Sequence, residues 1–208
     1  MNDMNKTSET RERLLEAAGA VFAERGFRDA TIREICERAN AKNVAAVHYH
    51  FGGKEELYRA AFDYARSYAP RTDESAFSPS SAEEPLSAYI HTALVRLFHE
   101  GRPAWLGRLV AQEMIAPTKM LDILVKHQIR PNSERLKAIV RELIGAEANE
   151  ETLQLCTFSV AAQWLFYFHC GQVVKRLKPK RRFGPTQIQR LAGHITKFSI
   201  TALKGGQP

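Results

Sequence analysis

The residues best suited to chemistry lie close together between Thr31 and Lys54, in the stretch TIREICERANAKNVAAVHYHFGGK. The stretch carries hydroxyl, amide, imidazole, phenol and basic groups, which are the side chains that hydrogen-bond phosphates and base edges. Ala45 and Ala46 stand among them, and their small side chains would let a helix approach a groove and touch a thymine methyl. The stretch therefore predicts a surface that reads double-stranded DNA.

Two short helices would hold these groups. Thr31, followed three residues later by Glu34, has the spacing of a capping box at a helix start. An apolar stripe follows at helical spacing, formed by Ile32, Ile35, Cys36 and Ala39, whereas Arg33, Glu37 and Arg38 are expected to face outward. A second helix is expected from about Asn43 to Phe51, with Val44, Val47 and Phe51 docked on the first. Because so short a helix is not stable alone, the pair predicts a helix-turn-helix.

Two more helices complete the expected headpiece. A helix over 10–25 has an apolar face of Leu14, Ala18, Val21 and Phe22, and Gly26 is expected to cap it. Gly52 and Gly53 end the second short helix, and a connector helix is expected over 54–68. The N-terminal stretch MNDMNKTSET has no apolar core, so we expect a frayed arm and no signal peptide.

At this point the sequence resembles the TetR family of bacterial transcriptional repressors. The resemblance rests on LLEAAGAVFAERGF (14–27), ATIREICERA (30–39) and VHYHFGGKEELYRAAF (47–62), and it covers about the first 65 residues. The turn NAKN is one residue longer than is usual, and Val47-His48 stands where Leu-Tyr is common. A weaker resemblance points to a subgroup with the recognition helix Asn-Ile-Ala-Ala-Ile-Asn-Tyr-His-Phe, here 43–51, and the motif Glu-Met-x-x-Pro-Thr, here 113–118.

The residue types and the resemblance together imply a set of DNA contacts. These are Thr31, Arg33, Lys42, Asn43, Ala45, Ala46, His48, Tyr49, His50 and Lys54. The alternative is a small structural bundle whose polar helix is merely solvated. His48 and His50 are two residues apart and point to different sides of a helix, and no carboxylate or cysteine stands at ligand spacing, so we expect neither a metal nor a cofactor.

The charge distribution and the cysteine content constrain the DNA-binding prediction and the expected compartment. The net charge is +7, but residues 1–70 hold 11 Lys/Arg and 11 Asp/Glu, so the excess lies entirely in the remainder. The DNA prediction must therefore rest on local placement of groups. The three cysteines form no paired framework, and Cys156 and Cys170 are too far apart on one helix to bridge. A reducing cytoplasm is the expected setting.

The rest of the chain has helical patterns and no alternating strand. Residues 69–85 are rich in Pro, Ser and charge and are expected to form a linker. The helices beyond it are expected over 86–100, 104–116, 118–129, 131–145, 150–178 and 186–203. The fold class is therefore all-α, with a DNA-binding domain over 1–68 and a regulatory and dimerisation domain over 69–208.

The stretch 152–174 has no charged residue in 23 positions. A membrane span needs about 20 apolar residues, but Gln154, Gln163, His169 and Gln172 would be costly in lipid. We favour burial by a second subunit and expect no membrane. The resemblance likewise implies a homodimer whose last two helices form a four-helix interface, here with Phe158, Leu165, Phe168, Leu191, Ile195 and Phe198.

Several aromatic and sulfur-containing residues would suit either a core or a ligand cavity. The resemblance implies a small-molecule effector in the C-terminal domain, and the candidate lining is Phe98, Trp105, Met114, His127, Trp164 and Tyr167. Ordinary core packing is the alternative for each. The basic run 175–183 has six basic residues in eight positions; it is either a solvated loop or a contact for an acidic ligand, nucleic acid or partner.

These observations favour a homodimeric regulator that represses transcription from a pseudo-palindromic operator until an unidentified small molecule releases it. A DNA-binding regulator of the same fold without a small-molecule ligand is the alternative. The sequence contains no nucleophile elbow, phosphate loop, zinc signature or paired catalytic carboxylates. We therefore do not expect an enzyme.

Overall fold

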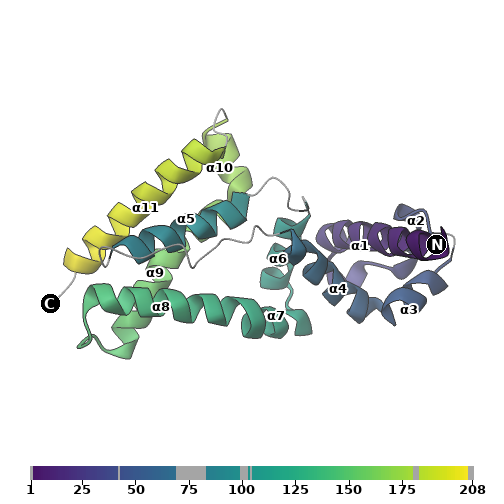
Figure 1. The fold of residues 1–208 in the computed structure, drawn as a ribbon, viewed down its shortest axis with the longest axis horizontal. Helices are drawn as coiled ribbons and strands as arrows, with labels where there is room; N and C mark the ends of the chain where they lie inside the picture. Colours follow the sequence, from purple (N-terminus) through teal and green to yellow (C-terminus); the bar gives the residue numbers. More distant parts are fainter. Residues whose placement is uncertain are drawn as a thin grey trace. The chain divides into compact units, whose positions relative to one another are not determined.

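The computed structural model describes residues 2–41, 43–68, 83–98, 103, 105–179 and 183–205. Throughout these ranges the regular secondary structure is helical (Figure 1), which confirms the all-α class. The helices form two compact units, the first made of residues 1–69 and 101–123 and the second of residues 70–100 and 124–208. Residues 101–123 follow the expected linker in sequence, yet they belong with the headpiece.

The first unit contains the four expected headpiece helices, a fifth helix and the beginning of a sixth. Its helices are α1 (Asn2–Asp29), α2 (Ile32–Arg38), α3 (Ala45–Phe51), α4 (Lys54–Ser67), α6 (Leu106–Ile115) and the start of α7 (Lys119–Leu124). Helix α1 begins at Asn2 rather than near Thr10, because no Pro or Gly interrupts this polar stretch. A kink at Gly26, where φ is 77°, separates the last turn of α1 from the rest.

Helix α1 is the centre of this unit. Its predicted apolar face is buried completely, with Leu14, Ala18, Val21 and Phe22 all without exposure. Helices α4 and α6 pack along it. A methyl group at Gly19 would overlap the indole ring of Trp105, whose Nε1 donates a 2.8 Å hydrogen bond to Glu16. Only glycine allows α1 and the start of α6 to lie so close.

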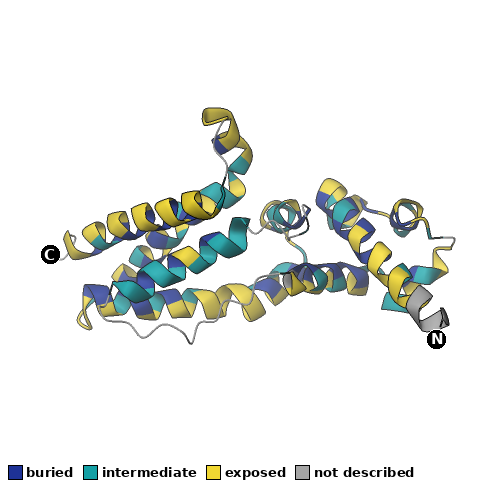
Figure 2. Ribbon diagram, turned by 45° about the horizontal axis from the view of Figure 1, so that its top comes forward, coloured by how far each residue is buried: buried dark blue, intermediate teal, exposed yellow. Residues whose placement is uncertain are grey.

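The second unit contains α5 (Glu84–Phe98), the π-helical turn η2 (Val125–Ile129), α8 (Arg130–Ile144), α9 (Glu150–His169), α10 (Gly171–Leu177) and α11 (Pro185–Gly205). Helix α11 packs on α5, α8 and α9. Figure 2 shows the buried residues in dark blue on the faces that these helices turn toward one another. The core includes Leu86, Ile90, Leu136, Leu153, Trp164 and Ile195.

Two further differences from the predicted helices concern the places where a helix is interrupted. A break is expected before Pro131, but one helical run continues from Lys119 to Ile144. In the π-helical turn the Arg130 N–H donates to the Val125 carbonyl five residues back, and this wider turn accommodates a proline that cannot donate. Conversely, the helix predicted over 150–178 is divided at Cys170, where φ is −100° and ψ is 20°.

Other predictions fall partly outside the described residues. Most of the expected linker, residues 69–82, lies outside them, as do residues 180–182 of the basic run. All three cysteines are described, and each is free. Within the described residues, no helix combines the length and the apolar character that crossing a membrane requires.

Candidate nucleic-acid interface

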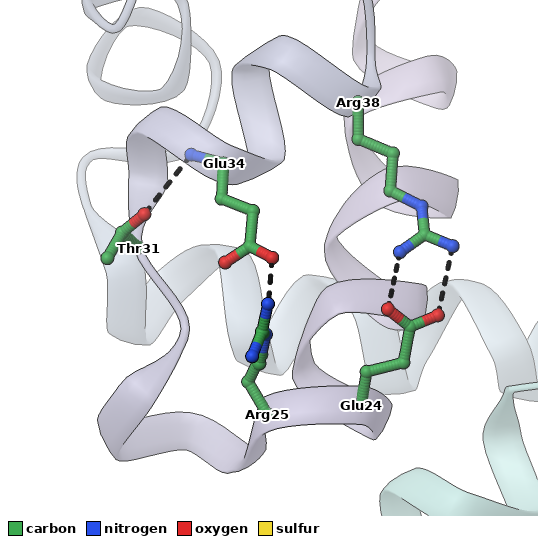
Figure 3. A network of polar contacts seen from close by, with 5 residues as sticks. All are labelled: Glu24, Arg25, Thr31, Glu34 and Arg38. Carbon is green, nitrogen blue, oxygen red and sulfur yellow. Dashed lines mark hydrogen bonds and ion pairs between the residues drawn. The ribbon is translucent and has the colours of Figure 1, made fainter.

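Helix α2 is capped and attached to α1 at its N-terminal end. The Thr31 hydroxyl accepts a 3.1 Å hydrogen bond from the Glu34 backbone N–H, as the capping-box spacing predicted. The Glu34 carboxylate, however, pairs with Arg25 on α1, with 3.3 Å between Oε1 and Nε (Figure 3). Glu34 thus joins two helices.

A second ion pair holds the other end of α2. The Arg38 guanidinium donates two hydrogen bonds, of 2.7 and 2.9 Å, to the two carboxylate oxygens of Glu24 on α1 (Figure 3). These bonds lower the pKa of Glu24 below its usual value. Arg38 was expected to face outward, and this contact was missed because its partner is 14 residues away.

Asn43 sets the start of α3. Its side-chain Oδ1 accepts a 3.0 Å hydrogen bond from the Ala45 N–H, and its carbonyl accepts one of 3.0 Å from Ala46. The same carbonyl lies 3.8 Å from the Cys36 sulfur, which donates to it. Burial raises the pKa of the Cys36 thiol, so this thiol stays protonated and can act as the donor. Asn43 therefore orients α3 on α2.

Helix α3 is anchored by few residues. Val47 is fully buried and Phe51 half-buried, but Val44, which was expected to dock, is exposed. The opposite side carries Tyr49, whose side chain is 80% exposed, and His48, whose Nδ1 lies 3.2 Å from the Gly52 carbonyl. The exposed polar and aromatic side chains of this seven-residue helix therefore do not contribute to the packing of the unit.

Lys54 lies at the start of α4, just after α3 ends at Gly52 in the left-handed region with φ 90°. Its ammonium donates a 3.2 Å hydrogen bond to the Arg28 carbonyl and lies 4.9 Å from the ring centroid of Phe27. Burial lowers the pKa of Lys54, and the nearby Asp29 opposes this effect. The ammonium has three donors, so this contact leaves it able to bind a phosphate as well.

Arg11 is a basic residue beside α3 that the sequence did not identify. Its guanidinium lies 5.3 Å from the ring centroid of Phe51, the last residue of α3, at a cation–π distance. The two residues are 40 positions apart, and no local pattern links them. The exposed Arg11 thus adds a positive charge beside the end of α3.

The predicted DNA contacts lie on α2, on α3 with the turn before it, and at the start of α4. Lys42 lies outside the described residues. Arg33 is exposed and pairs with Glu37 at 2.9 Å, an exposed pair that is weak enough to exchange for a phosphate. The others are exposed (Thr31, Asn43, Ala45, His48, Tyr49) or half-buried (Ala46, His50, Lys54). No described member of the set is buried.

The six candidate ligand residues are not brought together. Trp105 packs under α1 and Met114 is exposed on α6, so both belong to the first unit. In the second unit Phe98 stacks on Phe183 at 4.0 Å, and Tyr167 meets the same ring edge-on. Trp164 packs against Tyr89 in the core, and His127 is exposed in the π-helical turn.

The six candidate dimer residues divide by exposure. Phe158 and Leu165 on α9 and Phe198 on α11 are exposed, and Phe168 is half-buried. Leu191 and Ile195 are instead buried in the core of their own unit, because they lie on the face of α11 that packs inward. These two therefore do not belong to a surface offered to a partner.

Comparisons with known proteins match both parts of the chain. Residues 82–203 match the family described as the C-terminal domain of the HTH-type transcriptional dual regulator CecR, and residues 14–61 match the tetR family of bacterial regulatory proteins. The chain is 25% identical to CecR of Shigella flexneri over 173 residues, which is 78% of this chain and 77% of CecR. It is 40% identical to the transcriptional repressor AcnR of Corynebacterium glutamicum over 70 residues, 34% of this chain and 35% of AcnR.

Solved structures share the fold. The TetR-family regulator PfmR from Thermus thermophilus has a TM-score of 0.63 and 19% identity, covering 91% of this chain and 95% of PfmR. An HlyIIR mutant protein has a TM-score of 0.60 and 24% identity, covering 91% of this chain and 98% of its own. With family matches over the headpiece and over more than half of the chain, the protein belongs to the TetR family and is a DNA-binding transcriptional regulator with a C-terminal domain of the CecR type.

Proposed function

We propose that this regulator is a homodimeric repressor that binds a pseudo-palindromic operator through α3 and leaves it when a small molecule binds the C-terminal domain. The exposed face of α3 is the observation that carries the proposal. It presents Ala45 and Tyr49 on a helix that is held in place by Val47, Asn43 and the capped α2. Such a helix matches the element that enters the major groove in helix-turn-helix proteins.

The residues divide into base and phosphate contacts. Ala45 and Ala46 lie in the first turn of α3, where small side chains allow close approach to base edges. Tyr49, His50 and Lys54 follow at its end and at the start of α4, where hydroxyl, imidazole and ammonium groups suit phosphates. Because residues 1–70 have no net charge, phosphate binding depends on where these groups stand.

Dimerisation through α9 and α11 is supported by the two apolar sides of α9. Its inward stripe is Leu153, Thr157, Val160 and Trp164, and a second stripe of Leu155, Phe158, Leu165 and Phe166 is exposed. Exposed apolar surface of this extent marks an interaction site. On α11 Phe198 is exposed too. A two-fold dimer would present two copies of α3 to successive major grooves.

Release by an effector requires that the small molecule bind the free and the DNA-bound conformations with different affinity. The membership of the TetR family supports this part, and Phe98, Tyr167 and Phe183 form an aromatic group in the second unit for an apolar ligand. The relative CecR is described as a dual regulator, which makes activation at some promoters the second candidate. Either action on chromosomal DNA places the protein in the cytoplasm.

The test is a nuclease footprint of the chain on the DNA upstream of its own gene. We expect protection of an inverted repeat, and we expect Ala46→Leu to abolish it because the larger side chain obstructs the groove. Ala138→Leu, on the exposed side of α8, is the matched control and should leave the footprint intact. Equal protection of a scrambled sequence, or a footprint unaffected by Ala46→Leu, would contradict the proposal.

The small-molecule part needs a separate measurement. A ligand that binds only the folded state raises the melting temperature, so thermal shifts against a metabolite library separate a ligand-responsive repressor from a regulator without an effector. A hit should also weaken the footprint. The absence of any hit that does both would favour the alternative.

A further inference from the structure

The first unit contains a cavity that none of the proposed DNA contacts lines, although Lys54 touches two of its lining residues, Phe27 and Arg28. The last turn of α1, helix α4 and the segment from Pro117 through α7 line this cavity of about 300 Å³. Its apolar wall consists of Phe27, Tyr58, Pro117, Met120 and Ile123. The volume lies at the small end of the range for ligand sites, which fits a compact molecule of one or two rings.

The segment that forms one side of the cavity is held by a buried carboxylate. Glu113 on α6 is 1% exposed and accepts three hydrogen bonds: 2.6 Å from the Tyr58 hydroxyl, 2.9 Å from the Thr118 hydroxyl and 3.0 Å from the Thr118 N–H. The Thr118 hydroxyl in turn accepts a 3.1 Å bond from Met120 N–H. Each of these buried polar groups has a hydrogen-bond partner. The hydrogen bonds therefore fix the position of Met120 before any ligand binds, and they keep the cavity open.

The charges at the cavity favour an anion. Arg28, Arg59 and Lys119 line it and are exposed, and none of the three forms an ion pair with another described residue. Two carboxylates also line the cavity, but Glu56 is turned back toward the start of its own helix. Its Oε2 lies 3.0 Å from where a Cβ on Gly53 would be. With Glu55 and Glu56 set against the three cations, the side chains that line the cavity still carry one net positive charge.

We propose that this cavity binds a small amphipathic anion, an aromatic or aliphatic carboxylate or sulfonate. Its apolar part would lie between Phe27, Met120 and Ile123, and its acid group would meet the guanidinium or ammonium groups at the rim. The ligand would contact α4, which follows the recognition helix after two glycines. An effect on DNA affinity rests on the proposed function, whereas the binding itself does not.

The test uses naphthalene-1-sulfonate, a two-ring anion, as the probe and isothermal titration calorimetry on the full chain. Ile123→Trp places a large ring in the cavity and should weaken binding about tenfold, the equivalent of about 1.4 kcal/mol. Ile115→Trp is the matched control, since Ile115 is 80% exposed on α6 and does not line the cavity. It should leave the affinity unchanged.

A second pair of variants tests the charge without altering packing. Lys119→Gln and Arg59→Gln should each weaken binding about threefold, as expected for an exposed charge pair. Arg108→Gln removes an exposed charge from the same unit outside the cavity and should have no effect. No binding by the unaltered chain, or binding that Ile123→Trp and Lys119→Gln leave unchanged, overturns the proposal.

The footprint is repeated with the probe present to separate the two proposals. The probe could bind, and its binding be weakened by the variants as expected, while the footprint persists. In that case the cavity is a binding site, but its occupation does not affect DNA binding. If the chain gives no footprint even without the probe, the proposed operator binding fails while the calorimetry still decides the site.

Discussion

The Tyr58 hydroxyl donates a 2.6 Å hydrogen bond to the buried carboxylate of Glu113, 55 residues later in the chain. This bond joins α4, which follows the recognition helix, to α6. Burial, together with this bond and the charge of Glu113, raises the pKa of Tyr58 above its usual value. The phenol is therefore a permanent donor at physiological pH.

Tyr58→Phe should lower the free energy of unfolding by about 1–3 kcal/mol, because it leaves a buried carboxylate with one donor fewer. Urea denaturation followed by circular dichroism measures the change. Tyr68→Phe is the control: Tyr68 hydrogen-bonds Tyr64 at 2.8 Å but is exposed, so its loss should cost no more than about 0.5 kcal/mol. Equal effects of the two variants would show that burial of Glu113 does not matter.

Arg38→Gln should remove a pH-dependent part of the stability. The folded-state pKa of Glu24 lies below its usual 4.5, so the pair contributes above about pH 4.5 and its contribution is lost as the pH falls through the lowered pKa. The unaltered chain should thus unfold at higher urea than the variant at pH 7, and the gap should close in acid. A gap of the same size at all pH values would contradict this assignment.

Gly19→Ala should destabilise the protein although it raises helix propensity. Alanine favours a helix by about 1 kcal/mol over glycine, but the new methyl group would overlap the Trp105 ring, and overpacking of this kind costs about 1–3 kcal/mol. The sign of the change in unfolding free energy decides between the two effects. At Gly171, where a Cβ would meet nothing within 4 Å, the same substitution should be neutral or stabilising.

Phe158→Glu combined with Phe198→Glu should convert the proposed dimer to a monomer, since each charge would be desolvated in an apolar interface. Analytical ultracentrifugation measures the mass. Ile129→Glu, on an exposed apolar residue of the π-helical turn, should leave the mass unchanged. A chain that is monomeric before any substitution would exclude this interface.

Local patterns in the sequence predicted the headpiece well. Apolar periodicity and the glycines at positions 26 and 52 define α1 to α4, and the structure has these helices in the expected order. The same reasoning missed the continuous helix through Pro131, because a π-helical turn leaves no periodic signal. It also treated residues 150–178 as one helix, because a single glycine such as Gly171, next to the break at Cys170, weakens a helix without necessarily ending it.

Contacts between distant residues were beyond sequence reasoning. Glu113 was singled out only as part of a motif, and its partner Tyr58 lies on a helix that the sequence assigned to another domain. Arg38 and Arg11 were likewise missed, because their partners, Glu24 and Phe51, are distant in sequence. Trp105 was predicted to line a ligand cavity only because it is aromatic. In the structure its indole packs against α1.

The inclusion of α6 in the first unit bears on protein engineering. A fragment cut at residue 68 would lack Trp105, Leu109 and Glu113, so the face of α1 that packs on α6 would be exposed and Tyr58 would lose its hydrogen-bond acceptor. A hybrid regulator that joins this DNA-binding unit to the ligand-binding domain of another protein therefore needs residues 101–123 in addition to the first 68 residues.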